Sequence, residues 1–256
     1  MNAAVLRELV DLLLPRRCVG CERAGAALCA ACARLDVRRL TVAGVPVHAS
    51  SAYRGAVRAA VLSYKERARA DLRRPLAALL AQAVCSLLAD LADATPSGSP
   101  LASVAPLAPV ASLAPVALVP VPSSRAATRR RGEDVVRRLA GAASHRVARA
   151  QGTSVPVAAA LRLARPVLDS AGLTVAERAQ NLAGAMAATG PVRSRCAVVV
   201  DDVCTTGASV AEAARALDAA GWRVLGAAVV AATPAPQDRG ATMPSTSGQP
   251  QLTRLP

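Results

Sequence analysis

A chain of 256 residues with 53% apolar side chains is long enough to bury one sizeable core. It contains no phenylalanine and only 1% aromatic residues, which argues against a dedicated single-strand nucleic-acid binder, because such proteins stack bases on aromatic rings. The net charge of +14 leaves a nucleic acid, an anionic membrane or a phosphorylated small molecule open as partners, as well as a plain bias toward arginine.

The amino-terminal stretch MNAAVLRELVDLLLPRRC carries Arg7, Glu8 and Asp11 inside its apolar part. These charges interrupt the hydrophobic segment that a secretory signal requires, so we expect a short amphipathic helix. Residues 101–122 are long enough to cross a bilayer, but they contain five prolines, which break helical hydrogen bonding. We therefore expect no membrane span and a cytoplasmic protein.

Four of the seven cysteines fall in one short segment, CVGCERAGAALCAAC, where Cys18, Cys21, Cys29 and Cys32 form two CxxC pairs separated by seven residues. Each pair can place two thiolates on one turn, and two such turns complete a tetrahedron around zinc. A redox pair and cysteines without a role are the alternatives, whereas disulfides are rare in a reducing cytosol. Because four thiolates leave no open ligand position, we predict a structural zinc site in a module over residues 1–38.

The segment 39–233 is predicted to be the main domain, and its first half begins with a strand over 40–47. One or two helices are expected in the segment 53–92. Residues 95–117 repeat Ala, Pro, Val and Ser without a helical or strand period, which indicates a low-complexity insertion. The tail 234–256 has a similar lack of periodicity, and we expect it to be disordered.

The second half of the domain repeats a strand-then-helix order. A strand over 117–122, whose prolines are tolerable only at a strand end or edge, precedes a helix over 132–150. Thr174 and Glu177 have capping-box spacing, which predicts a second helix within residues 174–188.

Two continuous apolar runs, 198–200 and 224–230, have the length of strands that are covered on both faces. The segment SVAEAARALDAAGW between them predicts a helix with an apolar face. Together these elements predict an α/β fold with a doubly wound, parallel sheet flanked by helices.

The stretch CAVVVDDVCTTGAS places Asp201 and Asp202 at the end of the first of these strands, where ligands bind in open parallel sheets. The next residues form a small, hydroxyl-rich loop, which comprises Thr205, Thr206, Gly207, Ala208 and Ser209. Ser209 and Glu212 have capping-box spacing for the helix that follows. Loop amides and a helix start predict a phosphate cradle, and the carboxylates can accept hydrogen bonds from sugar hydroxyls or hold Mg²⁺ that bridges to a pyrophosphate. A strand that merely ends on capping aspartates is the alternative.

The motif AVVVDDVCTTGAS resembles the site for phosphoribosyl pyrophosphate in type I phosphoribosyltransferases. In order along the chain, the four-cysteine module, SYKERARADL, LVPVPSSRAATRRRGED, ERAQNLAGAM and this motif resemble the ComF family of competence-associated, phosphoribosyltransferase-like proteins, over about residues 10–232. The resemblance implies a small zinc module joined to a Rossmann-like phosphoribosyltransferase domain.

The resemblance also implies roles for individual residues. Asp201 and Asp202 would meet the ribose hydroxyls and a metal, and the loop from Thr205 to Ser209 would bind the 5-phosphate. The other implied binding residues are Ser123, Ser124 and Arg125 in the pyrophosphate loop, with Lys65, Arg131, Arg178 and Asn181 facing the same cleft. Lys65 is the only lysine of the chain, which hints that a compact ammonium is needed there, although a chance lysine on a solvated helix is an alternative.

The chain departs from the family pattern on the acceptor side. The family's RGFNQ appears here as RGEDV, with Glu133, Asp134 and Val135, and a glutamine expected near Ser170 is missing. Thr205 stands where purine-salvage relatives carry a catalytic carboxylate, so proton abstraction from a purine by that route is not available.

Two functions follow as expectations. The first is a phosphoribosyltransferase that binds phosphoribosyl pyrophosphate with Mg²⁺ and transfers the phosphoribosyl group to an unidentified nitrogen acceptor. The second is a non-catalytic, nucleotide-sensing or DNA-associated protein that supports competence and recombination, with single-stranded DNA or recombination proteins as partners.

Overall fold

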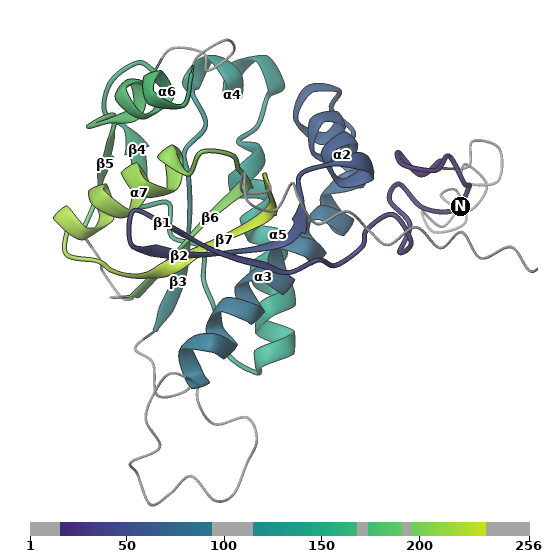
Figure 1. The fold of residues 1–256 in the computed structure, drawn as a ribbon, viewed down its shortest axis with the longest axis horizontal. Coiled ribbons are helices and arrows are strands. Elements are labelled where there is room, and N and C mark those ends of the chain that lie inside the picture. The colour runs from purple at the N-terminus through teal and green to yellow at the C-terminus, as the bar shows by residue number, and fades with distance from the viewer. Residues whose placement is uncertain (1–15, 94–114, 168–173, 191–195, 234–256) are drawn as a thin grey trace, which may run out of the picture.

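The computed structural model describes residues 16–93, 115–167, 174–190 and 196–233 (Figure 1). The predicted amino-terminal helix, most of the insertion and the tail 234–256 lie outside these ranges. The four-cysteine segment comes first, and the first strand begins at Arg38.

Five strands form the central sheet, in the spatial order β1-β2-β7-β6-β3. They are β1 (Arg38–Val42), β2 (Val45–Ala52), β3 (Val116–Pro120), β6 (Cys196–Cys204) and β7 (Arg223–Ala232). Four of them run parallel, and β1 is antiparallel to β2. Nearly all residues of β3, β6 and β7 are buried, as the continuous apolar runs predict.

Helices cover both faces of this sheet (Figure 1). On one face, α2 (Gly55–Glu66), α3 (Arg73–Asp93) and α5 (Val135–Gln151) share one apolar core with the strands. On the other face, α7 (Ala208–Ala219) packs in a second core. The expected α/β class, with a mostly parallel sheet between helices, is confirmed.

The segment Ala70–Asp93, which comprises the short 3₁₀ helix η1 (Ala70–Leu72) and α3, has the length and hydropathy of a membrane span. Half of the most apolar part of this segment is buried inside the protein, and α3 packs against α5, β2 and β7. Because core helices of soluble proteins share this length and composition, the segment is weak evidence for a membrane.

A small second sheet lies on the α7 side of the molecule. It pairs β4 (Leu161–Leu163) with β5 (Met186–Ala188), and α6 (Val175–Leu182) connects them. The apolar side chains of both strands join the core around α7. This unit packs α6 against α7.

The outer edge of β3 is not open to solvent. The amide of Leu118 donates to the Pro156 carbonyl at 2.8 Å, and the amide of Ala158 donates to the Leu118 carbonyl at 2.9 Å. A single parallel bridge also joins Leu118 to Val157. Pro120 ends the strand, which agrees with the expectation that proline is tolerated at an edge.

Three predicted elements were wrong in their bounds. The strand predicted over 40–47 is a hairpin, because Ala43 and Gly44 adopt the positive φ values of 48° and 81° that a tight turn requires. The helix predicted from residue 132 is preceded by an additional helix, α4 (Arg125–Arg131), which ends at Gly132 in the left-handed conformation. The helix predicted within 174–188 ends at Leu182, and the chain then turns into β5.

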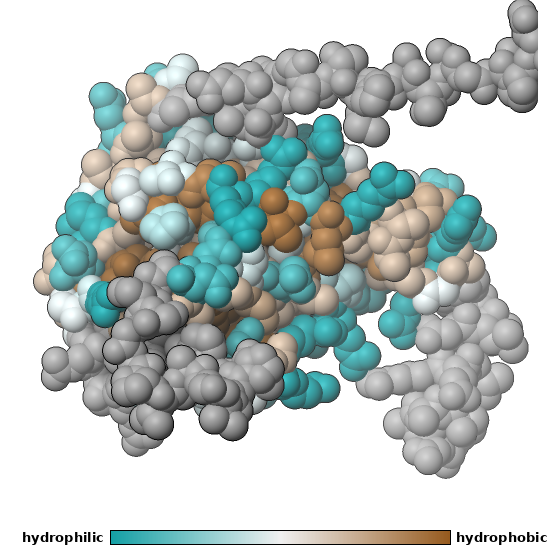
Figure 2. Space-filling model, turned by 60° about the horizontal axis from the view of Figure 1, so that its bottom comes forward, coloured by the Kyte–Doolittle hydropathy of each residue, from teal (hydrophilic) through white to brown (hydrophobic). Residues whose placement is uncertain are grey.

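Few large apolar side chains are exposed on the described residues. Figure 2 shows one face, on which hydrophilic side chains surround small apolar areas. Within the described ranges, Leu35 is the one large apolar side chain that is mostly exposed, at 59%.

Candidate functional site

The four cysteines of the amino-terminal segment lie together. The sulfur atoms of Cys18, Cys21, Cys29 and Cys32 are all within 4.8 Å of one another, and those of Cys21 and Cys29 are 3.6 Å apart. A tetrahedral zinc ion with Zn–S bonds of about 2.3 Å separates its sulfurs by roughly 3.8 Å, so the cluster fits zinc. The predicted metal site is therefore present as a group of four free thiols at ligand distance.

Backbone amides donate hydrogen bonds to a sulfur atom of this cluster and favour its thiolate form. The amides of Gly20 and Cys29 donate to the Cys18 sulfur at 3.5 and 3.4 Å. Burial works to raise the pKa of Cys18, but these amides outweigh it and lower the pKa to about 6. Since metals bind thiolates, the amides favour the form that a zinc ion requires.

The cysteine module packs directly on α2. Cys18, Ala27 and Leu28 belong to the same apolar core as Val57 of α2. A Cβ atom on Gly20 would collide with the Cβ of Ala56, so the module approaches the helix closely at this point. The module and the domain therefore share one packed interface.

Asp201 and Asp202 lie at the carboxyl end of β6 and are nearly buried, with exposures of 8% and 5%. Consecutive strand residues emerge on opposite faces, so Asp202 emerges toward α2 and Asp201 toward the loop before α7. The Asp202 amide donates to Asp201 Oδ1 at 2.8 Å. Burial, and then the Asp202 carboxylate, raise the pKa of Asp201. Such a carboxyl group is a strong acceptor for a ligand hydroxyl once it is ionised.

Lys65 forms an ion pair with Asp202. The helix α2 places Lys65 in its last turn, and Lys65 Nζ lies 2.6 Å from Asp202 Oδ2. Burial of the ammonium works to lower its pKa, but the two aspartates raise it overall. Lys65 is therefore charged, and it contacts Asp202 but is not among the residues that line the cavity beside the loop.

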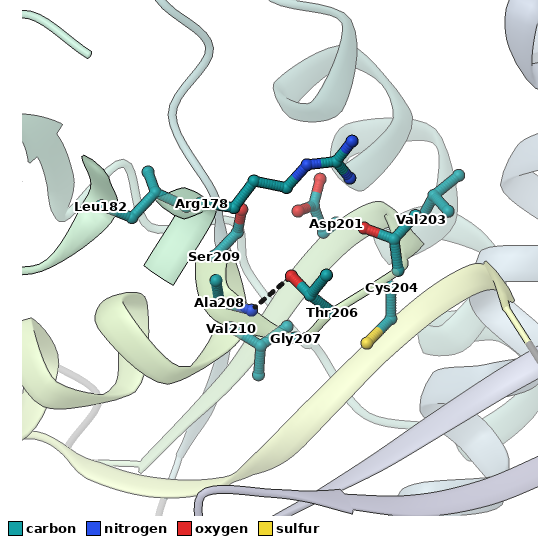
Figure 3. A pocket seen from close by; sticks show the side chains of 11 residues that line it. Arg178, Leu182, Asp201, Val203, Cys204, Thr206, Gly207, Ala208, Ser209 and Val210 are labelled. Atoms are coloured by element: carbon teal, nitrogen blue, oxygen red, sulfur yellow. Dashed lines mark hydrogen bonds between the residues drawn. The ribbon is translucent and has the colours of Figure 1, made fainter. Parts of the chain in front are cut away.

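The loop between β6 and α7 lines a small cavity of about 90 Å³ (Figure 3). All five predicted loop residues line it, together with Asp201 and Arg178. Figure 3 shows the Arg178 side chain reaching across the cavity on the same side as the Asp201 carboxylate. The Thr206 hydroxyl accepts a hydrogen bond from the Ala208 amide at 3.4 Å. The arrangement offers amides and hydroxyls to an anion, with a cation and a carboxylate at its rim.

Gly207 fixes the shape of this loop. Its φ of 78° is left-handed, and it is the N-cap residue of α7. A Cβ atom at this position would lie 2.6 Å from Val42 Cγ2 and closer still to Cγ1. Both the conformation and the contact with β1 therefore require glycine.

The predicted capping box of Ser209 and Glu212 is wrong. α7 begins at Ala208 after Gly207, and no side chain caps it. Glu212 instead accepts a hydrogen bond from the Met186 amide of β5 at 2.9 Å and pairs with Arg215 at 2.8 Å. The glutamate thus joins α7 to the small sheet, and Ser209 is left on the cavity wall.

The segment after β3 contains helix caps and a side-chain hydrogen bond that the sequence did not predict. Ser124 caps α4 by accepting a hydrogen bond from the Ala127 amide, and Ser123 donates to Asp134 Oδ1 at 3.2 Å. Asp134 also caps α5 by accepting from the Arg137 amide. The side chain of Arg125 lies outside the described residues. Asp134, which belongs to the RGEDV segment, therefore joins the loop that contains Ser123 to the start of α5.

Two other predicted residues, Arg131 and Asn181, do not line the cavity. Arg131, at the end of α4, lies close enough to Lys65 to lower the pKa of that ammonium. Asn181 lies on α6 and its carbonyl accepts from Arg165 at 3.0 Å, but it is not among the residues that line the cavity.

The sequence prediction missed five residues at this site. Val42 supports Gly207 from the edge strand, and four others line the cavity: Leu182, Val203, Cys204 and Val210. Burial raises the pKa of Cys204 to about 11, so it remains a neutral thiol. No sequence signal points to Val42, because it comes from a strand far away along the chain. Compared with known proteins, the chain matches no protein-family model and no curated protein.

Proposed function

We propose that this chain is a phosphoribosyltransferase-like protein of the ComF type, which binds phosphoribosyl pyrophosphate beside the loop 205–209. One observation carries the proposal: a buried carboxyl group, Asp201, stands at the rim of a cavity built from loop amides, hydroxyls and a helix start. A sugar phosphate has matching parts, since its phosphate accepts hydrogen bonds and its hydroxyls donate them.

In the proposed complex, the 5-phosphate lies against the loop from Thr205 to Ser209, which lines the cavity. Asp201, in its ionised form, accepts hydrogen bonds from the ribose hydroxyls. The Arg178 guanidinium, which borders the cavity, offsets negative charge on the ligand. Each contact uses a group whose chemistry is complementary to one part of the ligand.

The proposed reaction forms a bond from an acceptor nitrogen to the anomeric carbon and breaks the bond from that carbon to the pyrophosphate oxygen. The pyrophosphate leaves with the bonding electrons, and the proton of the acceptor nitrogen passes to solvent. Catalysis then depends on positioning and on stabilising the positive charge that develops on the sugar. Thr205 cannot serve as a base, so the acceptor has to be nucleophilic without help from that position.

The expectation that both aspartates hold Mg²⁺ does not fit this arrangement. Lys65 Nζ lies 2.6 Å from Asp202 Oδ2, which is the position that a metal ion would need. We therefore assign no step of the reaction to a metal held by this pair.

Calorimetric titration of the protein with phosphoribosyl pyrophosphate tests the proposal, with and without Mg²⁺. We expect saturable binding that weakens at least tenfold in Asp201→Asn, since one or two charge-assisted hydrogen bonds contribute about 1.5–3 kcal/mol each. Asparagine is neutral, as burial prefers, and it keeps an acceptor for the Asp202 amide, so the variant should fold.

Asp218→Asn is the matched control, because Asp218 is exposed on the far turn of the same helix, α7. Its affinity should equal that of the unchanged protein. No heat with the unchanged protein, or equal affinity in Asp201→Asn, would reject the proposed function.

A basic groove supports the second candidate, a DNA-associated protein. The groove, of about 530 Å³, lies between α3 and α5 and is lined by Arg74, His145, Arg146 and Arg149. Within the described ranges, no ion pair engages these three arginines. Three phosphate contacts predict that the logarithm of the affinity for single-stranded DNA falls with the logarithm of salt with a slope of about −2.

Fluorescence anisotropy of a labelled oligothymidine across a salt series measures this slope. Arg74→Ala with Arg146→Ala and Arg149→Ala should flatten it, whereas Arg162→Ala with Arg223→Ala, exposed elsewhere, should change it little. Absence of binding at low salt would exclude this candidate.

A further inference from the structure

The ion pair between Lys65 and Asp202 is short and largely shielded from water. The Lys65 side chain is 33% exposed, whereas Asp202 is nearly buried. Asp202 Oδ2 is buried and has no hydrogen-bond partner of standard geometry among the described residues. The Lys65 ammonium is the charged group that lies against it. Within the described part of the chain, Lys65 is the cation that lies at ion-pair distance from this carboxylate.

Three charged groups act on the Lys65 ammonium, namely two carboxyl groups and one guanidinium. Asp201 and Asp202 are consecutive residues near the end of β6, and both raise the pKa of Lys65. Arg131 opposes them, since its positive charge lowers the pKa of Lys65. Tyr64 precedes Lys65 on α2, and its pKa is raised to about 12 by burial, by Glu133 and by Asp202, so it stays neutral. Lysine is therefore the group that balances the acidic pair.

Two adjacent carboxylates at a strand end are typical ligands for Mg²⁺ or Mn²⁺, which bind oxygen at about 2.0–2.2 Å. A metal at that distance from Asp202 Oδ2 would meet the ammonium, which already lies 2.6 Å from the same oxygen. Two cations cannot share this oxygen without strong repulsion in a region with little water.

We propose that Lys65 is a built-in counter-cation, which occupies the position that a divalent metal would take at Asp202 Oδ2 and keeps metal ions from binding there. The site consequently presents Asp201 alone to a ligand's hydroxyl groups, and it takes an anionic ligand through amides and guanidinium groups, without a metal bridge from the protein. The inference adds to the proposed function but holds for any anionic ligand at this loop, because it concerns the protein's own charges.

Removing the lysine charge should expose a latent metal site. In Lys65→Met, whose side chain has a similar length, we expect one Mn²⁺ to bind at least tenfold more tightly than to the unchanged protein. Isothermal calorimetry and the Mn²⁺ electron spin resonance signal measure this, with Mn²⁺ alone as the probe. Zinc-loaded protein is used, so that the thiol cluster does not take up manganese.

Thermal unfolding gives a second measurement. Lys65→Met should lower the Tm, because Asp202 loses its partner, and Mn²⁺ should restore it. The double variant Lys65→Met with Asp202→Asn should recover much of the Tm without metal and should not respond to Mn²⁺. Lys65→Arg, which keeps the charge, should bind Mn²⁺ as weakly as the unchanged protein.

Two outcomes would overturn the inference. One is a Mn²⁺ site in the unchanged protein that Asp202→Asn removes, and this measurement does not require any lysine variant to fold. The other is a folded Lys65→Met protein that binds Mn²⁺ no better than the unchanged protein. Neither outcome depends on phosphoribosyl pyrophosphate, so a failure here is distinct from a failure of the proposed function.

Discussion

Replacing Gly207 by alanine is expected to lower the free energy of unfolding by about 2–5 kcal/mol and to abolish ligand binding at the loop. The left-handed conformation costs a residue with a Cβ atom about 1–2 kcal/mol, and overpacking in a dense region costs about 1–3 kcal/mol more. The overpacking arises because the new methyl group would overlap Val42 of β1. Urea unfolding measures the loss, and the single tryptophan, Trp222, reports it, since it is buried.

Two control variants separate the two causes. Gly152 has a φ of 65° but no neighbouring atoms within 4 Å of an added Cβ, so Gly152→Ala should cost only the conformational part. Adding Val42→Ala to Gly207→Ala removes the overlap and should recover part of the stability, even though Val42→Ala alone is destabilising. Equal losses in Gly207→Ala and Gly152→Ala would mean that the contact with β1 has no effect.

Loss of the metal from the cysteine module is expected to lower the Tm of the whole domain by roughly 10 °C, which corresponds to about 3–5 kcal/mol for a protein of this size. Structural zinc contributes its binding free energy to folding. The effect should reach the domain because Cys18, Ala27 and Leu28 share a core with α2. Cys29→Ser should reduce the zinc content from one ion per chain to none, which atomic absorption measures.

Cys85→Ser is the matched control, because Cys85 is a free cysteine of α3 outside the cluster. It should keep its zinc and nearly its full Tm. Stoichiometric zinc in Cys29→Ser would contradict the proposed ligand set, and an unchanged Tm after zinc loss would show that the module folds independently of α2.

The parallel sheet and its main helices could be predicted because local patterns determine them. The continuous apolar runs of β6 and β7 occur only where both faces of a strand are covered. The capping box of Thr174 and Glu177 is confirmed, since the Glu177 amide donates to Thr174 Oγ1 and the Thr174 amide donates to Glu177 Oε2 at 2.7 Å. Such signals depend on residues three or four positions apart.

The start of α7 could not be predicted in the same way. Ser209 and Glu212 have the spacing of a capping box, but the close contact of Gly207 with β1 moves the helix start toward the amino terminus. Glu212 then finds its partners on β5. The deciding contacts join segments that are far apart in the sequence, and no local pattern contains them.

The site was predicted best where one short motif supplies it. The five loop residues and Asp201 come from one strand and turn, and they surround one cavity. The contribution of Lys65 depends on how α2 packs against the sheet, which explains why the sequence indicated its importance but not its partner. On the acceptor side, Asp134 accepts hydrogen bonds from Ser123 and from the first turn of α5. The difference between RGEDV and the family's RGFNQ does not by itself reveal this role.

The covered border of β3 affects how copies of the protein meet at high concentration. An open row of amides and carbonyls invites a second chain to add a strand, which is a common route to aggregation. Here one border is occupied by the segment around Val157, and the other is the short β1, whose Arg38 and Arg39 are engaged by Asp36 and Asp90. Growth of the sheet from molecule to molecule is therefore disfavoured, despite a core rich in alanine and valine.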